Sequence, residues 1–310
     1  MSETDSEKKV KIALDECRVL MLGAQILFGF HLRAVFQDQF ASMPPVFRIL
    51  YAFAFLCMAV VVGLLIAPSM QHRFVERGRT SGRILDHTTW FAGLALLPFA
   101  LGLGADLTIV IGFKFGMTAG TVFGAATLLL ALAFWYGIEY WWRDRRRQER
   151  TMPEEKDTPL DIRVEHMLTE TRVLLPGAQA LFGFQLVVLL TAEFDKLPQP
   201  SKLVHVFALC AIAISVILLM TPAAVHRITF AGRNTERFHS IGSFFVVASA
   251  VPLAAGISAD IYVAIGKALG SSAFGLAAAL TTAALLAALW FVQPLILRLK
   301  RTRRRPRMAS

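Results

Sequence analysis

One stretch of the sequence occurs twice. Its first copy, residues 16–30, reads ECRVLMLGAQILFGF, and its second, residues 170–184, reads ETRVLLPGAQALFGF. Residue n therefore pairs with residue n + 154 (170 − 16 = 154), and the same offset holds without a gap as far as Gly116, which pairs with Gly270. A fixed offset over that length indicates a tandem duplication, in which each copy builds the same structural unit.

Composition places these two units in a membrane. The chain is 55% hydrophobic and only 17% charged, whereas about a quarter of the residues in a soluble domain are charged. Each half contains four apolar runs, most of them near the roughly 20 residues that cross a bilayer as a helix. We expect an all-α integral membrane protein with eight transmembrane helices, at about 19–36, 47–67, 88–107, 118–138, 173–190, 203–220, 241–258 and 272–297.

The charged segments divide the chain between these runs. The stretch after the fourth run is dense in charge and contains Pro153 and Pro159, which is typical of a linker. The expected organisation is a cytoplasmic N-terminal segment, a first four-span repeat, a charged cytoplasmic linker, a second four-span repeat and a basic cytoplasmic tail, at 1–15, 16–142, 143–167, 168–297 and 298–310.

The distribution of Lys and Arg predicts the orientation. Basic clusters occupy every second loop together with both ends of the chain, and such clusters favour the cytoplasmic side. Both termini are therefore expected in the cytoplasm, in the inner membrane of the cell. Four spans per repeat make the two repeats parallel, related as in a pseudo-dimer that descends from a four-span homodimer. The net charge of +10 then reflects contact with lipid and not with nucleic acid.

Polar residues inside the first span of each repeat are candidates for a pathway. Arg18, Gln25 and Gly29 share one helical face, and Gln179 lies on the corresponding face of the second repeat. A glutamine in a span points at protein or water, because its amide is costly against lipid. The two faces would line a polar pathway, or they would form a packing seam in which the glutamines bond across helices.

Two pairs of acidic residues recur at the offset. Glu16 and Glu170 precede their spans, where the helix dipole stabilises a carboxylate and where an acid could also exchange protons or cations. Asp106 and Asp260 are expected to end the third span of each repeat near the outer interface. There an acid would attract cations, cap a turn or pair with Lys114 or Lys267.

Two histidines recur as well. His72 and His226 follow the prolines near the end of the second spans, where each is an interfacial residue or a pH sensor. His31 has no counterpart in kind, since Gln185 stands at its paired position. The sequence contains no phosphate-binding loop, metal motif, cysteine pair or nucleophile elbow. We therefore predict no enzyme activity, no cofactor and no metal site.

The pattern Glu-x-Arg-Val-x5-Gln-x-Leu-Phe-Gly-Phe, followed one span later by Pro-x3-His-Arg, resembles a bacterial family of small four-span membrane proteins of unknown function. Some members of that family carry an automatic sodium:proton antiporter label. The resemblance covers each half nearly end to end, so the chain looks like two such units fused in tandem. It implies a multi-pass protein of the membrane with ion transport as its activity.

Two functions follow from these observations. In the first, the protein is a carrier or channel linked to protons or monovalent cations. Gln25 and Gln179 then line the path, Glu16 and Glu170 exchange ions at the inner mouth, and Asp106 and Asp260 attract them outside. In the second, it is a membrane scaffold or stress-linked interaction protein that transports nothing, and the repeated polar residues hold helices together.

Overall fold

The computed structural model describes residues 20–71, 74, 82–137, 159–228, 230 and 233–304. All regular secondary structure in these residues is helical. Glu16 and His72 lie outside the described residues, so the predictions made for them are not addressed by the structure.

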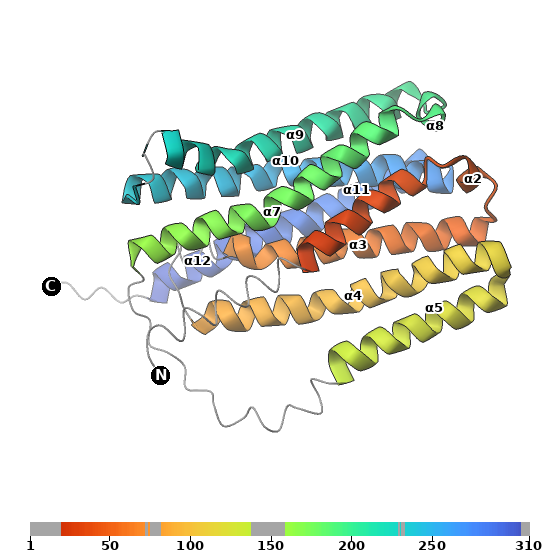
Figure 1. Ribbon diagram of the computed structural model, residues 1–310, viewed down its shortest axis with the longest axis horizontal. Coiled ribbons are helices and arrows are strands. Elements are labelled where there is room, and N and C mark those ends of the chain that lie inside the picture. Colours follow the sequence, from red (N-terminus) through yellow and green to blue (C-terminus); the bar gives the residue numbers. More distant parts are fainter. Residues whose placement is uncertain are drawn as a thin grey trace.

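The two repeats build the same order of helices. The first contains a helix at Leu20–Ala34, α2 (Asp38–Ala41), α3 (Pro45–Gln71), α4 (Gly82–Phe115), α5 (Met117–Leu132) and the π-helix η2 (Ala133–Gly137). The second contains α7 (Leu160–Leu189), α8 (Ala192–Asp195), α9 (Gln199–Ile228), α10 (Glu236–Leu269), α11 (Ser272–Ala287), the π-helix η4 (Ala288–Val292) and α12 (Gln293–Arg304). In Figure 1 the long helices run side by side, and α2 and α8 lie at the same end of the bundle.

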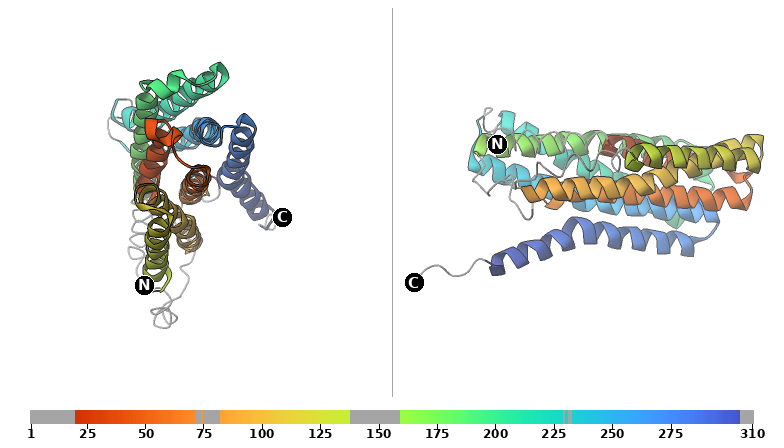
Figure 2. Two further views of the ribbon diagram at one scale, coloured as in Figure 1. Left: turned by 90° about the vertical axis from the view of Figure 1, so that its right-hand side faces the viewer. Right: turned by 90° about the horizontal axis from the view of Figure 1, so that it is seen from below.

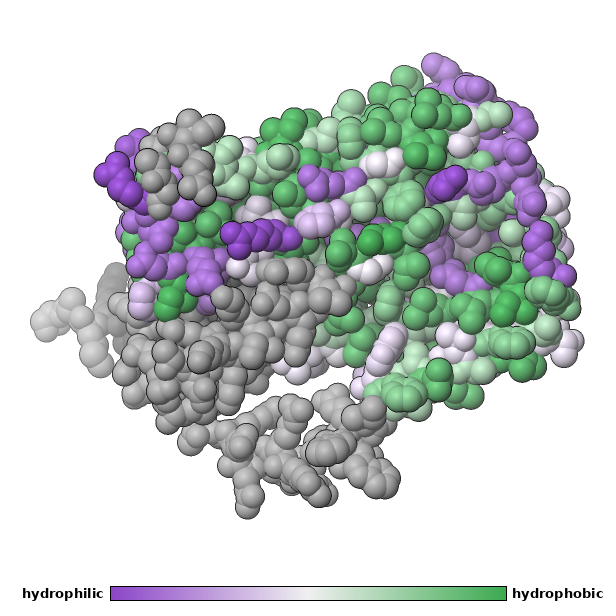
Figure 3. Space-filling view, in the orientation of Figure 1, coloured by the Kyte–Doolittle hydropathy of each residue, from purple (hydrophilic) through white to green (hydrophobic). Residues whose placement is uncertain are grey.

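The long helices fit a membrane protein. Within the described residues, seven helices are long and apolar enough to cross a bilayer, and the Leu20–Ala34 helix is apolar but shorter. Figure 3 shows a broad hydrophobic area across the middle of one face, with hydrophilic residues gathered towards its ends. That distribution is what a hydrocarbon layer between two aqueous sides requires.

Glycines form the turn between the third and fourth helix of each repeat. Gly116 has a φ of 96° and Gly270, its counterpart at the offset, has a φ of 64°. Both values are accessible to glycine at little cost and disfavour other residues. Each turn reverses the chain sharply, so that α5 packs against α4 and α11 against α10.

The third helix of each repeat is longer than the sequence indicated. Runs ending at residues 107 and 258 were expected, but α4 continues to Phe115 and α10 to Leu269. The prediction was wrong because it treated an acidic residue as a boundary, whereas the helix continues until a glycine turn stops it. Asp106 and Asp260 consequently lie about two and a half turns inside their helices, not at the helix ends.

Two further helices extend into segments that were predicted to be polar connections. α7 begins at Leu160, inside the stretch assigned to the linker, and α12 continues through Arg298 into the basic tail.

α3 lies at the centre of the bundle, and this breaks the symmetry of the repeats. It packs against α4 of its own repeat and against α10, α11 and η4 of the other. Within the most apolar window of α3, 72% of the residues are buried, against 33% for α9, its counterpart. Figure 2 shows α5 and α11 at different edges of the bundle. The two repeats therefore share their order of helices but not their packing environment.

Candidate functional site

A buried polar group joins three helices of the first repeat. His31 Nε2 lies 2.9 Å from Asp106 Oδ1, which links the Leu20–Ala34 helix to α4. The other ring nitrogen, Nδ1, lies 2.8 Å from the carbonyl oxygen of Leu27. Tyr51 of α3 donates its hydroxyl proton to the carbonyl oxygen of His31 at 2.6 Å. The His31 side chain is 7% exposed and that of Asp106 is 25% exposed.

The second repeat has a corresponding group on α7, α9 and α10. Gln185 Nε2 donates to Asp260 Oδ2 at 2.7 Å, and His205 Nε2 lies 3.1 Å from the carbonyl oxygen of Gln185. His205 Nδ1 is 3.7 Å from Asp260 Oδ1, and both of these side chains are completely buried.

The two groups occupy the same three positions at the 154-residue offset. His31 corresponds to Gln185, Tyr51 to His205, and Asp106 to Asp260. Each repeat therefore places one histidine beside its aspartate, but the histidine comes from the first helix in one repeat and from the second helix in the other. Identical residues at paired positions do not reveal this relationship, because Tyr51 and His205 are paired but differ.

The contacts of the histidines determine what the groups can do chemically. A carbonyl oxygen only accepts hydrogen bonds, so the ring nitrogen facing it must carry the hydrogen. In a neutral imidazole the remaining nitrogen is then an acceptor. In the first repeat this nitrogen faces a carboxylate oxygen of Asp106, which is also an acceptor when ionised. One proton held between His31 and Asp106 satisfies both atoms, and its loss leaves a poorly compensated negative charge.

The same constraint applies in the second repeat. The carbonyl oxygen of Gln185 requires a hydrogen on His205 Nε2, so Nδ1 of the neutral ring presents a lone pair towards Asp260 Oδ1. Each repeat thus places an imidazole and a carboxylate where they can hold and release a positive charge.

The lysines proposed as partners of these aspartates bind elsewhere. Lys114 donates to Gln39 Oε1 at 3.1 Å, and Lys267 donates to Glu193 Oε2 at 2.8 Å. The side chains of Asp106 and Asp260 are held by the residues at positions 31, 185 and 205 instead.

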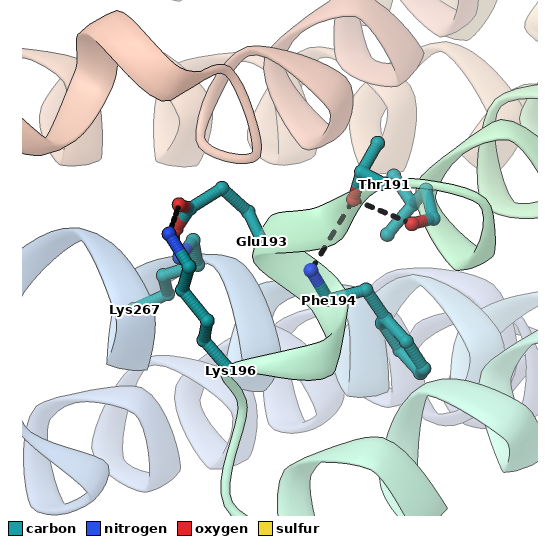
Figure 4. A network of polar contacts seen from close by, with 6 residues as sticks. Thr191, Glu193, Phe194, Lys196 and Lys267 are labelled. Atoms are coloured by element: carbon teal, nitrogen blue, oxygen red, sulfur yellow. Dashed lines mark hydrogen bonds and ion pairs between the residues drawn. The ribbon is translucent and has the colours of Figure 1, made fainter.

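Glu193 binds two lysines at the end of the bundle that contains α8. Thr191 caps the short helix by accepting from the backbone N–H of Phe194 at 3.3 Å, which fixes Glu193 in its first turn. Lys196 and Lys267 both donate to its carboxylate, as Figure 4 shows. The hydrogen bond from Lys196, followed by that from Lys267, lowers the pKa of Glu193 to about 2.

The glutamines of the predicted stripe lie in different environments. Gln25 is completely buried and packs against Gly177 of α7, where an added Cβ would overlap Gln25 Oε1. Neither polar atom of the Gln25 amide has a hydrogen-bond partner. Gln179, by contrast, is exposed. The first glutamine therefore lies at the contact between repeats, and the second does not.

Glu170 of α7 is completely buried. It shares the buried face of that helix with Gly177, which contacts Gln25, and with Gln185. These three positions follow one another at intervals of about two helical turns. The structure thus arranges polar groups at three levels along one helix.

His226 lies in the last turn of α9. Its ring stacks on Phe238 with 4.4 Å between the ring centroids, and its Nε2 lies 3.2 Å from Asn234 Oδ1. Asn234 in turn donates to Asp161 Oδ1 at 2.7 Å. His226, Asn234 and Asp161 line an open pocket together with Glu165.

No group of three or more His, Cys, Asp or Glu side chains within the described residues is placed to hold a metal ion. The residues that the structure brings together are the two sets at positions 31, 51 and 106 and at positions 185, 205 and 260.

The all-helical fold, with its long apolar helices, fits a membrane protein that carries ionisable side chains inside its bundle. The chain belongs to a family of unknown function, DUF6328, which matches it twice, at residues 2–139 and 153–294. The double match confirms the predicted fusion of two units of one uncharacterised family. No curated protein and no solved structure matches the chain.

Proposed function

We propose that the protein is a proton-linked transporter of monovalent cations. The observation that carries this proposal is the recurrence, at the matched positions 106 and 260, of an aspartate inside a long helix with a buried histidine of a neighbouring helix beside it. Ionisable residues inside membrane helices are costly, and they commonly mark proton relays and ion pathways. A purely structural role would be served as well by an uncharged pair.

The proposed arrangement has eight spans in two parallel four-helix repeats, with both termini on the cytoplasmic side of the inner membrane. The helix that contains Leu20–Ala34 supplies the eighth span. The common position of α2 and α8 at one end of the bundle supports parallel repeats. The predominance of Lys and Arg in alternate loops supports the orientation.

In the proposed mechanism, protons or cations move along the buried face of α7. Glu170 takes them up towards the cytoplasmic side, Gln25 provides a polar contact midway, and Gln185 leads to Asp260. The unpartnered amide of Gln25 supports this role, because a buried amide without a partner costs about 1–3 kcal/mol. A passing water or ion would satisfy it.

A scaffold that transports nothing is the second candidate. It is favoured by the close contact of Gln25 with Gly177, which holds the two repeats together. On this view the buried polar groups fix the packing of the helices and exchange nothing with the solvent.

Flux measurements distinguish the two functions. Purified protein is reconstituted into liposomes with a pH-sensitive dye inside, and gradients of Na⁺, K⁺ or Cl⁻ are imposed in turn. We expect a cation-dependent pH change that Asp106→Asn and Asp260→Asn each reduce by tenfold or more. Asp195→Asn is the matched control, since it makes the same change at an exposed position in α8. Folded protein that gives no flux under any gradient would contradict transport and favour the scaffold.

A further inference from the structure

The second repeat contains three buried polar atoms that lack hydrogen-bond partners and belong to one group. They are Gln185 Oε1, His205 Nδ1 and Asp260 Oδ1. All three residues are completely buried, and they come from three different helices, α7, α9 and α10. The amide nitrogen of Gln185 donates to Asp260 Oδ2. Gln185 Oε1 is bonded to the same carbon as that nitrogen, so it also lies close to the carboxylate.

Within the described part of the chain, no lysine or arginine pairs with the carboxylate of Asp260, and the imidazole of His205 is its nearest ionisable neighbour. The distance of 3.7 Å between His205 Nδ1 and Asp260 Oδ1 exceeds that of a hydrogen bond. Lys267 lies about two helical turns further along α10, and its ammonium group is bound to Glu193. An ionised carboxylate buried without a partner is strongly unfavourable. A proton or a bound cation would neutralise it, and the three unpartnered atoms offer lone pairs to a cation.

The first repeat differs in this respect. Both ring nitrogens of His31 and the hydroxyl of Tyr51 have hydrogen-bond partners. None of the side-chain atoms at positions 31, 51 and 106 is both buried and unpartnered. The buried polar atoms at these three positions thus have hydrogen-bond partners in the first repeat, whereas three of them lack partners in the second.

We propose that Gln185, His205 and Asp260 form a binding site for a dehydrated monovalent cation such as Na⁺. The carboxylate and amide oxygens are the hard ligands that such a cation prefers, and the imidazole lone pair completes the set offered by the side chains. One carboxylate neutralises one positive charge, whereas a divalent ion would leave the buried site with a net charge. This assignment rests on the proposed function and specifies it: the second repeat carries the cation and the first repeat the proton.

Residue exchange between the repeats tests this assignment. The double variant Gln185→His with His205→Tyr gives the second repeat the residues of the first, in positions where the fold already accommodates them once. Asp260→Asn removes the charge. Asp106→Asn is the matched control, because it makes the same change at the paired position of the other repeat.

The measurement is the thermal unfolding of the full-length protein in detergent, with LiCl, NaCl or KCl compared with choline chloride at equal ionic strength and pH. Wild type and Asp106→Asn are expected to show a saturable rise in Tm that discriminates among the three cations, as binding to the folded state requires. Both second-repeat variants are expected to lose it. The proposal is overturned if wild type shows no cation-specific shift, or if the shift survives in the double variant.

Binding and flux are separate readouts, so the two proposals can fail separately. If the protein shows a cation-specific shift in Tm but no flux in liposomes, the binding site is supported and transport is contradicted. Proton flux without any cation-specific shift rejects the site and leaves proton movement intact.

Discussion

Trp290 donates a hydrogen bond from its indole nitrogen to the carbonyl oxygen of Gly63, at 2.8 Å. The bond connects η4, near the end of the second repeat, to α3 in the middle of the first. Tyr136 stands at the corresponding position of the first repeat, and its hydroxyl donates to the carbonyl oxygen of Gly93 in α4 at 2.6 Å. Tyr136 of η2 therefore binds within its own repeat, whereas Trp290 of η4 binds across the interface between the repeats. The bond from Trp290 adds to the contacts of α10 and α11 that enclose α3, and α9 has no equivalent bond from Tyr136.

Replacing Trp290 tests how strongly this contact holds the repeats together. Trp290 is completely buried, so Trp290→Phe should lower the free energy of unfolding by at least about 0.6 kcal/mol for the lost hydrogen bond, and by more because the smaller ring leaves part of the site unfilled. Trp290→Ala should cost about 3–5 kcal/mol because it also leaves a cavity. Unfolding in mixed micelles measures both. Trp90→Phe is the control, since Trp90 is 60% exposed, and an equal loss there would contradict a specific role for Trp290.

A second prediction concerns the stability contributed by the contact between Gln25 and Gly177. A methyl group at position 177 would overlap Gln25 Oε1, so Gly177→Ala should destabilise the protein by about 1–3 kcal/mol through overpacking. Adding Gln25→Ala should restore most of that loss, which a double-mutant cycle would measure as coupling between the two positions. Gly183→Ala is the matched control, because no atom lies within 4 Å of the added Cβ. Losses that simply add would show that the two residues do not meet.

The repeats, the all-helical fold and the family resemblance could be predicted from the sequence, because an exact offset and long apolar runs are properties of the chain itself. The position of Asp106 and Asp260 within their helices could not. Hydropathy shows where the polarity of the sequence changes, but it does not show where a helix ends. A helix continues past a single carboxylate when neighbouring helices provide partners for that carboxylate. The contacts of the histidines were also hidden. His31 and His205 occupy unpaired positions in the sequence, and only the packing of three helices brings each of them to the equivalent aspartate.

The carboxylate of Glu193 should remain ionised under acidic conditions. Lys196 and Lys267 lower its pKa from 4.5 to about 2, so the folded protein binds this proton less readily than the unfolded chain does. The resulting stabilisation is complete above about pH 4.5 and is lost as the pH falls towards about 2. Glu193→Gln copies Gln39, the residue at the paired position of the first repeat. The difference in unfolding free energy between wild type and Glu193→Gln should therefore shrink over this pH range, as measured by chemical denaturation. A difference that stays constant would contradict the ion pairs.

Asp106 and Asp260 should differ in their reaction with an apolar carbodiimide. The reagent adds to a protonated carboxyl group that it can reach from the lipid or detergent phase, and it forms a stable acylurea. The side chain of Asp106 is 25% exposed, whereas that of Asp260 is completely enclosed by its neighbours. We expect peptide mass spectrometry to find the adduct on Asp106 at least tenfold faster than on Asp260. Asp106→Asn should abolish the fast reaction and Asp260→Asn should leave it unchanged. Equal labelling of the two aspartates in folded protein would show that the second site opens as readily as the first, and the difference in burial between the repeats would then have no consequence for access.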